Sequence, residues 1–217
     1  MDTARNPPGA IASPSLVFFA HDMSLQDLSQ HLAAAVTAFR AEGDIGALQE
    51  SLAHLVRDHP AAELAAAAEP YRTMPEVAGP IFEKVVEADP DNAKALVALA
   101  NAYWLAGRGP EKVGELASRA IAADPANRAG WHLWCLSESD PRERTIRWRQ
   151  VVARFADDDL ARATLADSAA SLAGAERDPE ALALAIGEYE ILRARAERPE
   201  QREALDKALT TLRAWSL

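Results

Sequence analysis

The chain has 217 residues, of which 49% are hydrophobic and only 6% are aromatic. Its 33 acidic and 23 basic residues give a formal net charge of −10, which repels a phosphate backbone and excludes nucleic acid and anionic membranes as expected partners. One cysteine cannot form an internal disulfide, and no apolar window is long enough to span a bilayer, so we expect a cytoplasmic protein.

The N-terminal stretch differs in composition from the rest of the chain. Residues 1–22 hold three prolines and Gly9, which oppose regular helix and predict a flexible tail ahead of one helical domain over 23–217. The tail contains an apolar segment, residues 16–20 (LVFFA), that is shorter than a signal-peptide core. Because an exposed segment of this kind favours aggregation, we hypothesise that it docks into a groove of its own chain or of a neighbouring copy, the latter giving a homo-oligomer.

Helix breaks follow at regular intervals. Ser24 and Asp27 have the spacing of a capping box, and Gly43-Asp44 separates a predicted helix over 24–42 from one over 45–59. Four later helices are expected to open with Pro-Glu, where proline loses no hydrogen bond and the glutamate faces the positive end of the helix dipole. These openings are at Pro75, Pro110, Pro179 and Pro199.

The breaks predict about eleven helices, paired as five hairpins with one left over. The last helix, from Pro199, places four apolar residues on one stripe: Leu205, Ala208, Leu209 and Leu212. Its other side is polar, which is typical of a helix that caps the apolar end of a stack.

A short sequence repeats within the chain. Residues 88–92 (ADPDN) return 35 residues later as 123–127 (ADPAN), and a period of this size is typical of stacked helical repeats. We expect the Asp-Pro of each copy to end one hairpin, and Asn92 or Asn127 to cap the next helix.

With Pro125 at position 32, the chain resembles the tetratricopeptide repeat (TPR) family, a 34-residue helical hairpin. The best match, 93–127, has suitable residues at positions 4, 7, 8, 11, 20 and 27: Leu96, Leu99, Ala100, Tyr103, Val113 and Ala120. The resemblance covers 29–138 by motifs and 139–217 by periodicity. It implies an all-α, right-handed α-α superhelix of about five helical hairpins with a C-terminal capping helix. Only 30 residues separate Pro60 from Pro90, so the first helix of that repeat is expected to be short.

The resemblance also implies a binding groove. In TPR proteins, positions 2, 5, 9 and 12 of each first helix face a concave groove, and on this chain they include Arg40, Lys94, Val97, Asn101, Trp104 and His132. The Asn101 amide can both donate to and accept from an extended peptide, and Trp104 offers a flat apolar anchor. Val97 stands where TPRs that clamp the acidic tails of chaperones have lysine, so this ligand is not expected.

Residues with reactive or metal-binding side chains have alternative interpretations. Cys135, with His132 one helical turn before it, suggests a nucleophile, but position 8 of the repeat requires a small buried side chain. The five histidines lack the spacing of metal ligands and are expected at the surface. The acidic run 157–159 suggests a cation loop, but N-cap and helix-dipole partners explain it better.

Two clusters of larger side chains also have alternative interpretations. Five arginines between Arg142 and Arg154 either receive an acidic partner segment or form the solvated outer face of a helix, and we favour the outer face. Three tryptophans, Trp131, Trp134 and Trp148, suggest a ligand box, but their helical spacing favours the core.

Together these features predict a non-catalytic scaffold or adaptor that binds a protein or peptide in a concave groove, with no cofactor and no metal. The alternative is a helical-repeat accessory subunit or assembly factor that acts through self-association and its outer faces. An enzyme is poorly supported, because the sequence has no Gly-rich phosphate loop, no Gly-x-Ser-x-Gly elbow and no Cys-x-x-Cys pair.

Overall fold

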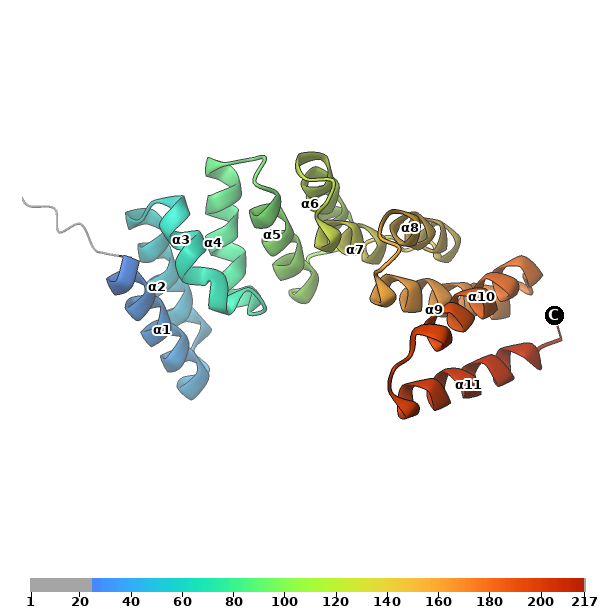
Figure 1. Ribbon diagram of the computed structural model, residues 1–217. Helices are drawn as coiled ribbons and strands as arrows, with labels where there is room; N and C mark the ends of the chain where they lie inside the picture. Colours follow the sequence, from blue (N-terminus) through green and yellow to red (C-terminus); the bar gives the residue numbers. More distant parts are fainter. Residues whose placement is uncertain (1–24, 217) are drawn as a thin grey trace, which may run out of the picture.

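The computed structural model describes residues 25–216, and this part of the chain contains eleven α-helices, one 3-10 helix and no strand. The helices follow one another along an arc (Figure 1). Their bounds are α1 Leu25–Glu42, α2 Ile45–Asp58, α3 Ala61–Ala68, η1 Glu69–Tyr71, α4 Pro75–Ala88, α5 Ala93–Leu105, α6 Pro110–Ala123, α7 Arg128–Leu136, α8 Pro141–Arg154, α9 Asp159–Glu176, α10 Pro179–Arg195 and α11 Pro199–Arg213. None of these helices is both long and apolar enough to cross a membrane.

The predicted helix starts are confirmed. Proline is the first residue of α4, α6, α10 and α11, as expected, and also of α8. The short sequence that occurs at 88–92 and again at 123–127 caps one helix in each copy. The side chain of Asn92 accepts a hydrogen bond from the Ala95 amide (3.0 Å), and that of Asn127 accepts one from the Gly130 amide (3.3 Å). Ser24 of the predicted capping box lies outside the described residues, as does the tail over 1–22.

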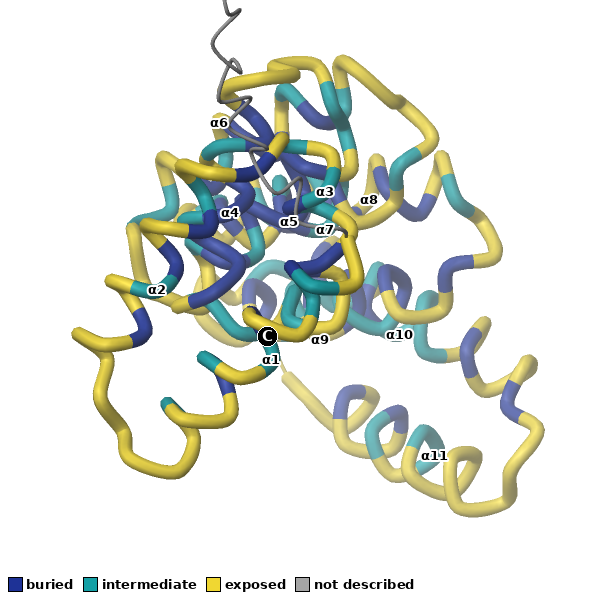
Figure 2. Tube along the Cα trace, turned by 90° about the vertical axis from the view of Figure 1, so that its left-hand side faces the viewer, coloured by how far each residue is buried: buried dark blue, intermediate teal, exposed yellow. Residues whose placement is uncertain are grey.

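Consecutive helices pack as antiparallel hairpins, and the aligned repeat has the burial that its TPR register predicts. Leu96, Ala100, Val113 and Ala120 are fully buried, and Leu99 is 4% exposed. Buried residues recur along the inward sides of the helices (Figure 2). One continuous apolar cluster extends from Leu28 in α1 to Leu133 in α7. The stack is thus an all-α TPR-like superhelix.

The second hairpin departs from the regular repeat. Its first helix, α3, has only eight residues and ends in η1, which confirms the short helix expected from the 30-residue spacing. Helix α3 packs on α1 and α4, whereas α5 packs on α4, α6 and α7, and α3 and α5 are not among the closely packed pairs. A space therefore remains between α3 and α5, and at its base Phe82 and Val85 of α4 are each 4% exposed.

Cys135 and the three tryptophans pack into or against the core, as expected. Cys135 is fully buried, which confirms its interpretation as a packing residue. Burial raises the pKa of its thiol to about 12, so the thiol is protonated at neutral pH. Trp148 is 2% exposed, and Trp131 and Trp134 are partly buried against the same cluster, with their rings edge to face at 5.7 Å.

The expectation that the histidines lie at the surface is wrong for two of them. His59 is only 8% exposed, because it ends α2 at the junction with α3. The His132 ring packs edge-on against Trp148, and its Nε2 lies 2.8 Å from a carboxylate oxygen of Asp158. His31 and His54 are exposed, and His21 lies outside the described residues.

The arginine cluster is a second correction, because most of its members contact their own chain. Arg147 stacks on the Trp134 ring and donates to the Trp134 carbonyl oxygen (2.8 Å). Arg154 donates to the carbonyl oxygen of Pro125 (2.9 Å), and Arg142 pairs with Asp178 (3.2 Å). These side chains link α8 to neighbouring helices and loops, so they form neither a purely solvated face nor a free basic patch.

The acidic run before α9 is a cap, as predicted. Asp158 accepts from the Ala161 amide (2.9 Å), while its neighbours Asp157 and Asp159 pair with Arg128 (2.7 Å) and Arg195 (2.8 Å). Further along the chain, Leu209 and Leu212 of the predicted apolar stripe of α11 are buried, and Leu205 and Ala208 are partly buried.

Candidate functional site: a hollow between α3 and α5

A hollow of about 530 Å³ lies where α3 and α5 are not closely packed. Its lining comes from α3, η1 and the residue after it, α4, α5 and the start of α7. The lining residues are Ala65, Ala66, Glu69, Arg72, Phe82, Val85, Asn92, Lys94, Ala95, Val97, Asn127 and Ala129. The first helices of three successive hairpins thus share one groove.

The floor of the hollow is apolar and its walls carry small side chains. Phe82 and Val85, each 4% exposed, project from α4, and Val97, 7% exposed, projects from α5. Ala66 and Ala129 are exposed on the walls. Because alanine side chains are short, another chain can approach the backbone of these helices closely and place apolar side chains on the floor.

The hollow carries little charge. Glu69 and Arg72 form an ion pair (3.1 Å) within the lining, so their charges cancel. Lys94 is exposed and makes no hydrogen bond or ion pair with another residue of 25–216. Its ammonium group is therefore free to pair with a carboxylate or a carbonyl oxygen of a ligand.

The predicted groove residues on α5 do not all lie in this hollow. Lys94 and Val97 line it. Asn101 is half-buried, and its side-chain NH2 donates to the backbone oxygen of Arg72 at 3.4 Å, which leaves the Asn101 side-chain oxygen for a ligand. Trp104, 41% exposed, lies ten residues after Lys94, or about 15 Å along the helix axis, and lines a separate hollow of about 300 Å³ beside Pro110.

The other two predicted groove residues lie on different helices. Arg40 is exposed in the last turn of α1, at the position equivalent to Trp104. His132, on α7, is held by Asp158, the N-cap of α9, so its imidazole links two successive hairpins. The structure therefore gathers only Lys94 and Val97 of the six predicted residues around one hollow.

The sequence analysis missed the floor residues Phe82 and Val85. Both belong to a second helix of a hairpin, which a regular TPR stack covers with two adjacent first helices. The signal that could have found them was the 30-residue spacing from Pro60 to Pro90, since a short α3 leaves a hollow between itself and α5.

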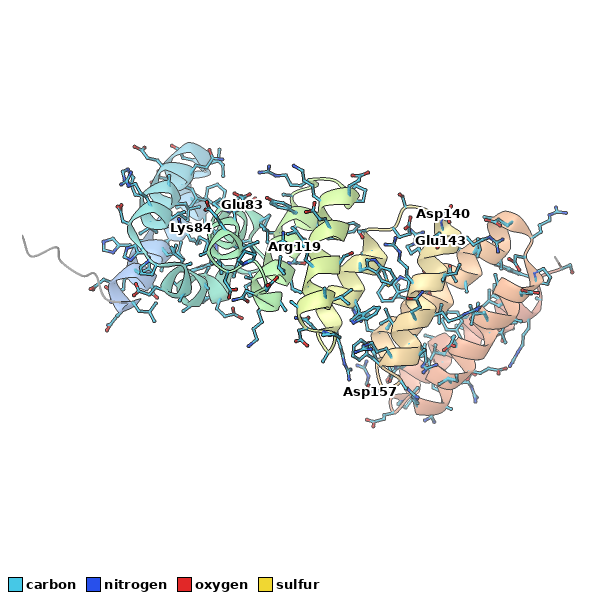
Figure 3. The ribbon with its side chains drawn as sticks, turned by 90° about the horizontal axis from the view of Figure 1, so that it is seen from above. Glu83, Lys84, Arg119, Asp140, Glu143 and Asp157 are labelled. Carbon is cyan, nitrogen blue, oxygen red and sulfur yellow. The ribbon has the colours of Figure 1, made fainter. Side chains whose placement is uncertain are left out.

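Another hollow, of about 470 Å³, lies between the second helices α4 and α6. Leu99 and Leu116 belong to its apolar lining. Glu83 of α4 and Arg119 of α6, both labelled in Figure 3, belong to its charged lining. These rim groups already have partners: Glu83 accepts from the Tyr103 hydroxyl (2.7 Å), and Arg119 donates to the carbonyl oxygen of Pro90 (3.0 Å). Burial and the bond to Glu83 raise the pKa of Tyr103 to about 12, so the phenol stays protonated.

Comparisons with known proteins support the fold. No protein-family model matches the sequence, and no curated protein shows a significant match. Among solved structures, the chain is similar to the MamA protein (14% identity, TM-score 0.54, covering 80% of this chain and 97% of the other). A thermophilic TPR protein of Thermus thermophilus, TTC0263, aligns with 16% identity and a TM-score of 0.49 over 84% of this chain and 99% of the other. At these identities the likeness concerns the fold alone, which is TPR-like.

Proposed function

We propose that this TPR-like chain is a non-catalytic scaffold that binds an extended segment of another protein in the hollow between α3 and α5. The observation that supports the proposal best is the hollow between α3 and α5, whose floor is formed by Phe82 and Val85 of α4, each 4% exposed. At about 530 Å³ the hollow has the size of ordinary ligand sites, which are roughly 300–1,000 Å³.

The lining indicates the chemistry of the ligand. Its apolar side chains would rest on Phe82, Val85 and Val97, and a carboxylate or carbonyl oxygen would meet the Lys94 ammonium group. An extended peptide rises about 3.3 Å per residue, so five residues span the 15 Å or so from Lys94 past Asn101 to Trp104. The ligand would thus be an apolar peptide with an acceptor near one end.

A scaffold needs no reactive group, and the cysteine is not poised for chemistry. Cys135 is fully buried, with the pKa of its thiol raised by burial, and a protonated thiol is a poor nucleophile. The proposal therefore assigns no catalytic residue.

Selection of random peptides displayed on phage against the full chain tests the proposal. Affinities of the enriched peptides would then be measured for Ala66→Glu and Ala129→Glu, which place a longer, charged side chain on each wall of the hollow. Both alanines are exposed and glutamate favours helix, so folding should be preserved. Ala122→Glu, exposed on α6 outside the hollow, is the matched control.

We expect both wall variants to weaken peptide binding at least tenfold, whereas the control retains it. Lys94→Glu should weaken binding of peptides that carry a carboxylate and spare those that do not. The proposal would be contradicted if the enriched peptides bound the unchanged chain, the two wall variants and the control with the same affinity.

The hollow between α4 and α6 supports the second candidate, an accessory subunit that acts through its outer face. Its lining includes Leu99 and Leu116, 4% and 7% exposed, on which an apolar side chain of a partner helix would rest. A partner whose binding is abolished by Glu115→Lys but not by Ala66→Glu would favour this function over the groove.

A further inference from the structure

We infer that the apolar segment of residues 16–20 (LVFFA) in the same chain docks in the hollow between α3 and α5 and competes there with external peptides. The inference rests on the proposed function of the hollow and names its first ligand. The sequence left two binding sites open for this segment, the groove of its own chain and the groove of a neighbouring copy, and the inference selects the first.

Helix α1 begins on the side of the stack at which the hollow opens. Successive helices are antiparallel, so the first helices α1, α3, α5 and α7 all begin on the same side of the stack (Figure 1). The hollow is lined at this side by Asn92 and Lys94, at the beginning of α5, and by Asn127 and Ala129, at the beginning of α7. The chain therefore enters α1 on the side at which the hollow opens.

The length of chain between the segment and α1 matches the distance. Packed helices lie about 8–10 Å apart, so α3, whose Ala65 and Ala66 line the near wall of the hollow, lies about 10 Å from α1. An extended chain covers about 3.3 Å per residue, which puts Ala20 within about 17 Å of Leu25, and Leu16 within about 30 Å. The segment can reach the hollow, whereas α9 to α11 lie beyond its range along the arc.

The chemistry of the segment matches that of the hollow. The five residues carry no charge and include Val17, Phe18 and Phe19. The floor is apolar, and the Glu69–Arg72 pair cancels the charge of one wall. Burial on this floor would remove the aromatic side chains from water, which favours docking over exposure.

The short connection favours the hollow of the same chain over that of a second copy. A ligand held by a short flexible linker has an effective concentration in the millimolar range, far above the micromolar concentration of other copies in solution. If the free segment binds with a dissociation constant of about 100 μM, the tethered segment would weaken an external peptide by roughly tenfold or more.

The experiment compares the full chain with its double variant Phe18→Ser/Phe19→Ser. The probe is a fluorescein-labelled peptide of residues 13–23, titrated by fluorescence anisotropy. We expect it to bind the double variant at least tenfold more tightly than the unchanged chain, because its own segment no longer occupies the hollow. Addition of Ala66→Glu to the double variant should abolish binding, and the control Ile11→Ser should behave as the unchanged chain.

Three results would overturn the inference. The probe could fail to bind the double variant, or it could bind both proteins equally. Light scattering could instead show a dimer of the unchanged chain that dissociates in the double variant, which would place the segment in a neighbouring copy. In each case the proposed function would stand if library peptides still lost affinity in Ala66→Glu and Ala129→Glu, so the two failures are distinguishable.

Discussion

Helices α1 to α6 and helices α8 to α11 are held together by different interactions. The first region shares one apolar cluster, which begins at Leu28 and continues as far as Leu133 of α7, and its ion pairs join residues at most four positions apart. The second region has three small clusters, and ion pairs connect its helices to one another and to α7. Alanine is the commonest of its buried residues, with Ala161, Ala166, Ala169, Ala173, Ala181 and Ala185.

The difference matters for function because the hollow lies in the first region. Apolar burial is insensitive to salt and moderate changes of pH, whereas exposed ion pairs contribute little each and are screened. The apolar cluster should therefore keep the candidate binding site folded in acid or at high salt. The C-terminal helices should unfold first under these conditions. This contrast has measurable consequences in each region.

The largest effect is expected from Leu96→Ala. Leu96 is fully buried at the centre of the long cluster, and its truncation leaves a cavity, so unfolding free energy should fall by about 3–4 kcal/mol. Leu209→Ala, at a 2% exposed position on the end helix α11, should cost less, because α11 packs mainly on α10 alone. Urea denaturation measures both, and equal losses would remove the contrast.

Glu188→Leu should have the next largest effect, and it examines the most buried arginine–carboxylate pair of the second region. Arg162, only 6% exposed, pairs with Glu188 across α9 and α10. Removal of the acid leaves a buried charge unpaired and should cost about 3 kcal/mol. The double variant Arg162→Leu/Glu188→Leu should recover most of that loss in the same denaturation experiment. A single variant as stable as the unchanged chain would show that this pair contributes nothing.

Acid should loosen the second region before the first. Burial raises the pKa of Asp158, but bonds from the Ala161 amide and His132 outweigh it, so the pKa is lowered overall. The bond from Arg193 likewise lowers the pKa of Asp206. A carboxyl whose pKa is lowered on folding stabilises the protein above its unfolded pKa of about 4, and this stability is lost as pH falls through the folded pKa.

Amide exchange followed by NMR at pH 7 and at pH 3.5 checks the order. Amides of α9 to α11 should lose protection at the lower pH while those of α5 and α6 keep it, and Asp158→Asn should reduce the difference. Earlier loss in α5 would contradict the contrast.

The smallest effect concerns Cys135, which lies between the two regions. Because burial raises the pKa of its thiol to about 12, iodoacetamide at pH 8 should alkylate it at least about 100-fold more slowly than a free thiol. Denaturation in urea should restore the fast rate, as the control. Fast labelling of the folded chain would mean that α7 and α8 separate readily.

The sequence predicted most of the fold because its signals are local. Proline at the first position, the caps Asn92 and Asn127, and the register of Leu96 and Ala100 each depend on neighbours along the chain. The roles of Arg147 and His132 could not be predicted in this way, because they depend on partners brought close only by packing. Trp134 for Arg147 and Asp158 for His132 are contacts between helices.

The candidate site was predicted only in part. Lys94 and Val97 follow from the repeat register, but Phe82 and Val85 line the hollow because the short α3 does not pack closely against α5. The length of a helix changes which faces of its neighbours remain uncovered, and a position-by-position alignment to a regular repeat does not contain that information.

Chemical-shift mapping by NMR tests the central claim most directly. A peptide enriched by the full chain would be titrated into the labelled protein, with amide signals followed for every helix. Binding in the hollow predicts the largest shifts at Ala66, Lys94, Val97 and Ala129. Largest shifts at Glu87, Leu116 and Arg119, around the hollow between α4 and α6, would contradict it.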